Sequence, residues 1–170
     1  MPMRLFAGIA FDAATREAFA QALERARPHA DHAKWTRVDK AHLTLVFIGD
    51  GDPQALADAV RAAAGRHRAF SLRLYGAGAF GRRVLWVGAE GELEPLQVLQ
   101  ADLAQTLARP DEHPYAPHVT LARAKKPRSF GPAVHALEGF ASPPFRVEAV
   151  TLFESVEGSY RSLVDAPLNR

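Results

Sequence analysis

The 170-residue chain contains no cysteine, which excludes disulfide frameworks, thiolate zinc sites, iron–sulfur clusters and cysteine nucleophiles. Long hydrophobic runs are also missing: residues 5–11 and 43–48 fall far short of the roughly 18 to 20 residues that a membrane-spanning helix needs. Neither charge dominates, because 21 Lys and Arg residues stand against 19 Asp and Glu residues. We therefore expect a cytoplasmic protein with no membrane partner, and any nucleic-acid partner has to be argued from local features.

The composition that remains is typical of a globular protein, with 48% hydrophobic and 24% charged residues. At this length folding buries about 70% of the surface that the unfolded chain exposes, so a packed core forms without cross-links. No composition shift marks a linker. We predict a single domain over residues 1–170, built as two lobes, with no obligate protein partner.

Hydrophobic periodicity predicts more strands than helices. Asp12 caps a helix that ends near Pro28, Asp52 and Pro53 begin a second helix that Gly65 ends, and leucines mark a third helix over residues 96–107. Strands are expected at residues 4–11, 34–38, 42–48, 70–75, 84–87, 118–122, 145–153 and 160–164, with a glycine-rich turn over residues 76–81. This order predicts an α+β fold with mainly antiparallel sheets and helices on the outside.

A His-x-Thr-Leu pattern occurs twice, at His42–Leu45 and at His118–Leu121. With seven histidines in 170 residues, random placement gives only about a quarter of one His-x-Thr match. Residues i and i+2 of a strand point to the same face, so each motif projects an imidazole and a hydroxyl side by side. If the two lobes pack about a pseudo-two-fold axis, the motifs face each other across a cleft.

Such a pair of motifs is suited to phosphodiester chemistry. Two imidazoles supply an acid and a base near neutral pH, because an unperturbed histidine has a pKa of about 6.5. The hydroxyls of Thr44 and Thr120 donate to non-bridging phosphate oxygens. We expect hydrolysis or transfer of a phosphodiester that requires no metal.

Several segments also carry a likeness to a known family: Arg4–Ile9, Trp35, His42–Gly49, Val84–Gly88 and, most specifically, Pro117–Arg123. Through them the chain resembles the LigT-like RNA 2',3'-cyclic phosphodiesterases, also named 2'-5' RNA ligases, of the two-histidine phosphoesterase superfamily. The resemblance implies a bilobal fold with a central cleft and hydrolysis of RNA 2',3'-cyclic phosphate ends to 2'-phosphomonoesters. It further implies that no metal and no other cofactor is used.

The resemblance also implies roles for single residues. His42 would be the proton donor to the departing 3'-oxygen, and His118 the proton acceptor that activates water. Thr44, Thr120 and Arg123 would bind the phosphate. With an RNA 5'-hydroxyl in place of water, the reverse reaction forms a 2'-5' linkage.

Arg123 raises a geometric difficulty. Strict strand alternation places it on the opposite face from His118, so its approach to the cleft requires a bend or a strand end.

Four further residues are candidate RNA contacts: Phe80, Arg82, Lys125 and Lys126. Single-stranded RNA is often held by aromatic and guanidinium planes, and cations follow its phosphates. Each has a plainer alternative, since Phe80 also suits the core and the basic residues suit a solvated loop. The remaining histidines lack metal-ligand spacing beyond His29-x-x-His32, and we expect them at the surface.

Two other functions stay open at this point. A related phosphoesterase would act on small cyclic nucleotides or on 2'-5' oligonucleotides. A non-catalytic RNA-binding module would use the cleft and the basic residues without chemistry, and the two complete motifs argue against it.

Overall fold

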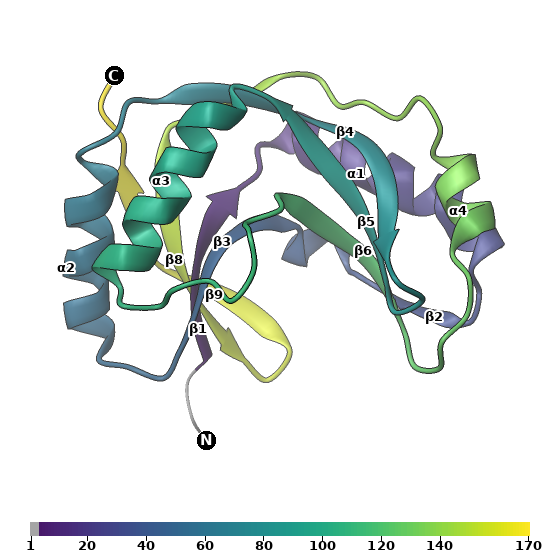
Figure 1. Cartoon of the computed structure of the whole chain (residues 1–170), viewed down its shortest axis with the longest axis horizontal. Helices are drawn as coiled ribbons and strands as arrows, with labels where there is room; N and C mark the ends of the chain where they lie inside the picture. Colours follow the sequence, from purple (N-terminus) through teal and green to yellow (C-terminus); the bar gives the residue numbers. More distant parts are fainter. Residues whose placement is uncertain (1–3) are drawn as a thin grey trace.

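Two antiparallel sheets form the frame of the computed structural model, which describes residues 4–170 (Figure 1). The first sheet has the strand order β3-β1-β8-β9 and the second the order β2-β6-β5-β4-β7. Their bounds are β1 (Arg4–Ala10), β2 (Ala33–Trp35), β3 (His42–Gly49), β4 (Phe70–Phe80), β5 (Val84–Gly91), β6 (His118–Ala124), β7 (Phe145–Val147), β8 (Ala149–Val156) and β9 (Ser159–Pro167). The predicted α+β fold with antiparallel sheets is confirmed.

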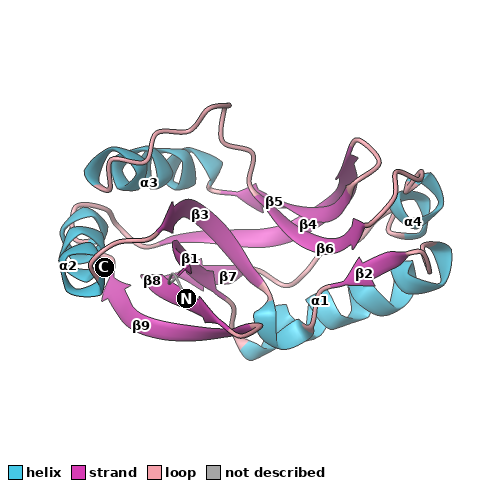
Figure 2. Cartoon of the chain, turned by 90° about the horizontal axis from the view of Figure 1, so that it is seen from below, coloured by secondary structure: helices cyan, strands magenta, loops and turns pink. Residues whose placement is uncertain are grey.

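The helices pack outside these sheets, at α1 (Ala13–Ala26), α2 (Pro53–Ala64), α3 (Leu93–Thr106) and α4 (Gly131–Ala136). The predicted caps are present: Asp12 Oδ1 accepts from the Thr15 amide at 2.8 Å, and Asp52 Oδ2 from the Ala55 amide at 3.2 Å. Figure 1 shows α2 and α3 side by side at one end of the molecule and α4 at the other. In Figure 2, α3 and α1 lie on opposite sides of the strands. Of the helices in the described residues, none is long and apolar enough to cross a bilayer.

A turn was predicted over the glycine-rich residues 76–81, but in the structure most of this segment belongs to strand β4. Gly76 has a φ of +71° and sits where the pairing of β4 with β5 shifts register, so the strand continues beyond a bulge. Gly78 is needed because a Cβ there would lie 2.4 Å from a ring carbon of Trp86 on the neighbouring strand. The true turn is confined to the three residues 81–83 between β4 and β5.

Other boundaries also differ from expectation. The strand predicted over residues 145–153 is two strands, β7 and β8, which belong to different sheets. Val38 lies in a short 3₁₀ helix, Val38–Lys40, and the short helix α4 was not predicted. The two short helices are too short for periodicity to resolve, and the division between β7 and β8 depends on their pairing with different sheets.

Candidate active site

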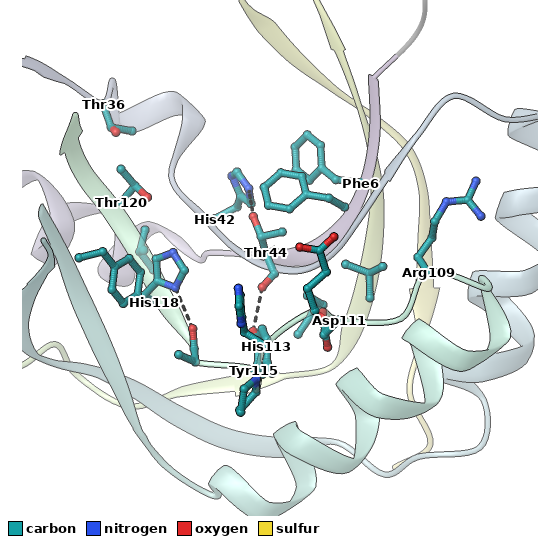
Figure 3. Close-up of a pocket in the computed structure, with 18 of the residues that line it drawn as sticks. Phe6, Thr36, His42, Thr44, Arg109, Asp111, His113, Tyr115, His118 and Thr120 are labelled. Carbon is teal, nitrogen blue, oxygen red and sulfur yellow. Dashed lines mark hydrogen bonds between the residues drawn. The ribbon is translucent and has the colours of Figure 1, made fainter. Parts of the chain in front are cut away.

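Both histidine motifs line one cavity of about 930 Å³ between the two sheets. His42 begins β3 and His118 begins β6, and each motif's threonine also faces the cavity (Figure 3). The alternation within each motif is as predicted, because the intervening Leu43 and Val119 are buried in the core. The structure therefore brings together the two imidazoles and two hydroxyls that the sequence singles out.

The His42 ring is held at both nitrogens. Nδ1 lies 2.8 Å from the backbone oxygen of Lys40, and Nε2 lies 2.7 Å from the hydroxyl oxygen of Thr44. Since a carbonyl only accepts, Nδ1 carries a proton in either charge state. Nε2 then accepts from the Thr44 hydroxyl when the ring is neutral and donates to it when the ring is charged. The protonation state of His42 therefore decides whether the Thr44 hydroxyl is free to donate elsewhere.

Aromatic rings enclose His42 on several sides. Its ring centroid lies 4.7 Å from that of Phe6, 5.4 Å from that of Phe153 and 5.3 Å from that of Tyr160. Burial lowers the pKa of His42 below its usual 6.5, and the hydrogen bond to the Lys40 carbonyl opposes this by a smaller amount. The enclosure therefore disfavours the charged form of the His42 ring, and an anion placed beside the ring would oppose this effect.

The surroundings of His118 are more open. Nδ1 lies 2.7 Å from the backbone oxygen of Ala116, so it donates and leaves Nε2 as the basic atom of the neutral ring. One aromatic ring contacts it: Phe80 stands edge-on at 4.8 Å, and Trp86 supports Phe80 at 5.4 Å. The two histidines thus share a Nδ1 anchor on a carbonyl and differ in how deeply they are enclosed.

Arg123 lines the same cavity as His118, against the expectation from strict alternation. The reason is a β-bulge. Along β6, Thr120 pairs with Trp86 while Ala122 pairs with Leu85, so the residue between them has no partner on β5. Both that residue, Leu121, and Ala122 are buried. The added residue returns Arg123 to the face that carries the motif.

The bulge is repeated in the other motif. Along β3, Thr44 pairs with Gly8 and Val46 with Ala7, which leaves Leu45 without a partner on β1. The same shift turns Phe47 toward the cavity, where 73% of its surface is exposed. Phe47 therefore occupies in the first motif the place that Arg123 occupies in the second.

Strand β3, which carries the first motif, is an edge strand of the first sheet. Side chains from the other half of the chain bind two of its backbone oxygens. The Tyr115 hydroxyl donates to the Thr44 oxygen at 2.8 Å, and Gln100 donates to the Leu45 oxygen at 3.2 Å. Burial raises the pKa of Tyr115 well above its usual range, with the Asp111 carboxylate adding to the effect. The phenol thus stays protonated, and its hydrogen bond links the segment before the second motif to the backbone of the first motif.

Comparison with known proteins identifies the family of the chain. The family model of the 2'-5' RNA ligase superfamily matches residues 15–159. The chain belongs to this superfamily. A Thermus thermophilus protein named RNA 2',3'-cyclic phosphodiesterase is 32% identical over 163 residues, which cover 82% of this chain and 80% of the relative. A Geobacillus stearothermophilus protein of the same name is 32% identical over 133 residues, or 71% of this chain and 42% of the relative.

The share of the relatives that is matched varies: the chain spans less than two thirds of the Geobacillus protein and also of an Aeropyrum pernix relative, of which 60% is covered. Solved structures match over the full length. E. coli LigT in its apo form is 27% identical with a TM-score of 0.77 and covers 99% of both chains. E. coli LigT complexed with 3'-AMP is 27% identical with a TM-score of 0.78.

The candidate RNA contacts of this superfamily member do not all reach the cavity. Phe80 lines it beside His118. Lys125 and Lys126 are exposed just beyond the end of β6 and do not line it. Arg82 lines a second cavity, of about 860 Å³, between β4 and α4. We therefore leave Arg82 out of the site.

Several cavity residues were not predicted from the sequence. Among them are Lys40, Thr36, Asp111 and His113, of which His113 is one of the histidines expected at the surface. These come from loops and strand ends without a motif, so only the fold brings them to the site.

Two of the histidines expected at the surface are partly buried instead. His67 Nε2 donates to the Asp102 carboxylate at 2.6 Å with 16% of the His67 side chain exposed, and the Nε2 atom of His32 is buried. Within residues 4–170, no group of three or more His, Cys, Asp or Glu side chains is arranged to hold a metal ion.

Proposed function

We propose that this protein hydrolyses 2',3'-cyclic phosphate ends of RNA to 2'-phosphomonoesters, with His42 and His118 as its acid and base. The observation that carries the proposal is the single cavity that presents both imidazoles, each anchored at Nδ1 on a backbone carbonyl. Relatives from Thermus and Geobacillus bear the name RNA 2',3'-cyclic phosphodiesterase, and E. coli LigT has been crystallised with phosphate and with 3'-AMP. These names support the substrate class.

His118 is the proton acceptor in this proposal. Its Nδ1 proton is engaged by the Ala116 carbonyl, so the Nε2 lone pair is the one available to a water molecule. Nε2 takes a proton from the water as the water oxygen forms a bond to phosphorus. The bond between phosphorus and the ribose 3'-oxygen breaks in the same displacement.

His42 is the proton donor. When its Nε2 is protonated, that proton passes to the departing 3'-oxygen, which completes the 3'-hydroxyl and leaves the phosphate on the 2'-oxygen. Burial disfavours the charged ring in the empty site, so the phosphodiester anion itself promotes the charged form. Binding and protonation are thereby coupled, and the Thr44 hydroxyl turns its donor toward the phosphate once Nε2 no longer needs it.

Thr120 and Arg123 bind the non-bridging phosphate oxygens in this scheme, since both line the cavity on the face that carries His118. A guanidinium is suited to this task because it offers paired donors and a permanent charge to the oxygens on which charge develops. In reverse, with an RNA 5'-hydroxyl in place of water, the same groups would form a 2'-5' linkage.

The test is to incubate the protein, in the presence of EDTA, with a short RNA that ends in a 2',3'-cyclic phosphate. We expect a product that comigrates with a 2'-phosphate standard, is separated from the 3'-phosphate standard and is sensitive to phosphatase. A 3'-phosphate product would contradict the assigned roles of the two histidines. Conversion of a cyclic mononucleotide but not of the RNA end would instead favour a small-nucleotide phosphoesterase.

A further inference from the structure

A pair of cations lies side by side on the cavity face of the second sheet. Lys34 of β2 pairs directly with Arg123 of β6, and both side chains are exposed. Paired residues of adjacent strands share a face, and Thr36, two residues after Lys34, lines the cavity together with Arg123. The cation pair is therefore continuous with the proposed phosphate site.

Like charges opposite each other on neighbouring strands are destabilising unless something neutralises them. Among residues 4–170, no ion pair within 4.0 Å joins Lys34 or Arg123 to a carboxylate. Such a pair is stabilised by an anion that bridges the two side chains.

The positive charge continues past the strand end. Lys125 and Lys126 follow β6, and the Arg83 guanidinium reaches the Lys125 oxygen at 3.4 Å, which holds this loop against the β4–β5 turn. All three side chains are exposed and none forms an ion pair in the part of the chain that the structure describes. We call the exposed cations Lys34, Arg83, Arg123, Lys125 and Lys126 the basic edge.

Negatively charged side chains line the opposite end of the cavity. Asp111 and Glu112 line it there, and Figure 3 shows Asp111 and Arg109 across the site from Thr36 and Thr120. Arg109 lies at the same end and keeps its charge, but backbone oxygens take its N–H donors, including that of Ile48 at 2.9 Å, and the two carboxylates outnumber it. The carboxylates repel a phosphate chain at this end, so the cavity has one favourable exit for a polyanion.

We propose that the RNA chain preceding the reacting phosphate leaves the cleft across the basic edge, with its backbone phosphates on Lys34 and Lys126, beyond the reacting phosphate that Arg123 binds. This inference rests on the proposed function and deepens it, because it makes an oligonucleotide, and not a free cyclic nucleotide, the substrate that the whole surface recognises. A cyclic phosphate is the 3' end of its RNA, so the remaining chain lies entirely on the 5' side and needs a single exit.

The experiment compares two double variants that remove the same charge. Lys34→Gln/Lys126→Gln alters the basic edge, and Arg68→Gln/Arg170→Gln removes two exposed cations beside the C-terminal end of the chain. Binding of a fluorescent single-stranded RNA of about ten nucleotides with a terminal phosphate, a length within the footprint of single-strand-binding folds, is measured against salt concentration. Hydrolysis of a cyclic mononucleotide is measured in parallel, with thermal unfolding as the check on folding.

For the basic-edge variant, we expect the slope of log affinity against log salt to fall by about 1.4, since each phosphate contact on a single strand contributes about 0.7. Its hydrolysis of the cyclic mononucleotide stays at the wild-type rate, and the control variant keeps the wild-type slope. An equal loss of slope in both variants, or in neither, would overturn the proposal.

The two proposals fail separately. Wild-type protein that binds the oligonucleotide with the expected slope but opens no cyclic phosphate would overturn the proposed function and leave the basic edge in place. If the protein hydrolyses the cyclic phosphate but the two double variants show the same salt dependence of RNA binding, the basic edge is overturned and the proposed function stands.

Discussion

Replacement of Gly8 by alanine tests how closely the backbone positions His42. Gly8 pairs with Thr44 on the neighbouring strand, and a Cβ added to it would lie 2.8 Å from the Leu43 oxygen and 3.4 Å from Cδ2 of the His42 ring. Ordinary contacts of a Cβ begin near 3.4 Å, so β3 has to move by about 0.6 Å. Because a misplacement of about 1 Å can cost about 10²-fold in rate, we expect about a tenfold loss in kcat.

The assay is steady-state hydrolysis of a 2',3'-cyclic nucleotide, with thermal unfolding measured on the same samples. Overpacking of this kind costs about 1 to 3 kcal/mol, which lowers the melting temperature of a domain of this size by a few degrees. Gly131→Ala is the control, because its Cβ would meet only the Ser129 hydroxyl, at 3.2 Å, at the start of α4. An unchanged kcat in Gly8→Ala at wild-type stability would refute the reasoning.

Three further predictions concern single groups. In an NMR titration of the free protein we expect the pKa of His42 to lie below 6.5 and to rise when inorganic phosphate is added; a value above 6.5 without phosphate would contradict the role of burial. Arg66 holds the pKa of Asp102 well below its usual 3.8, so ionised Asp102 favours the folded state above that pH. Asp102→Asn should therefore lower the melting temperature at pH 7, and the difference from wild type should shrink as the pH falls; a constant difference would argue against it. Tyr115→Phe leaves the partly buried backbone oxygen of Thr44 without its donor, at a cost of about 1 to 3 kcal/mol in the free energy of unfolding, and should leave the pH–rate profile in place.

The side-by-side placement of a histidine and a threonine in each motif could be predicted from sequence because it depends only on local periodicity. Residues i and i+2 share a face in any strand, so His42 with Thr44 and His118 with Thr120 needed no tertiary information. The helix caps at Asp12 and Asp52 are local in the same way.

Strand alternation alone could not explain how Arg123 reaches the cavity, because its position depends on pairing between strands. The extra residue Leu121 is recognised only once Ala122 and Thr120 are seen to oppose consecutive residues of β5. A bulge has no signature in a run of apolar residues, and without it the alternation rule puts Arg123 on the wrong face.

The enclosure of His42 also lies beyond local rules. Phe6, Phe153 and Tyr160 come from three different strands and converge on one ring. Burial, and with it the lowered pKa, is a property of that convergence. The same holds for Lys34. No motif in the sequence includes it, and only its pairing with Arg123 shows that it lies beside the proposed phosphate site.

The central claim is that two histidines act as acid and base on one phosphate, and the pH dependence of kcat/KM for the wild type, His42→Gln and His118→Gln tests it most directly. General acid–base catalysis contributes about 10² to 10⁴-fold for each group, so each variant should fall by that factor. The wild type should give a bell-shaped profile, with the alkaline limb lost in His42→Gln and the acid limb lost in His118→Gln. A bell shape that persists in either variant would contradict the claim.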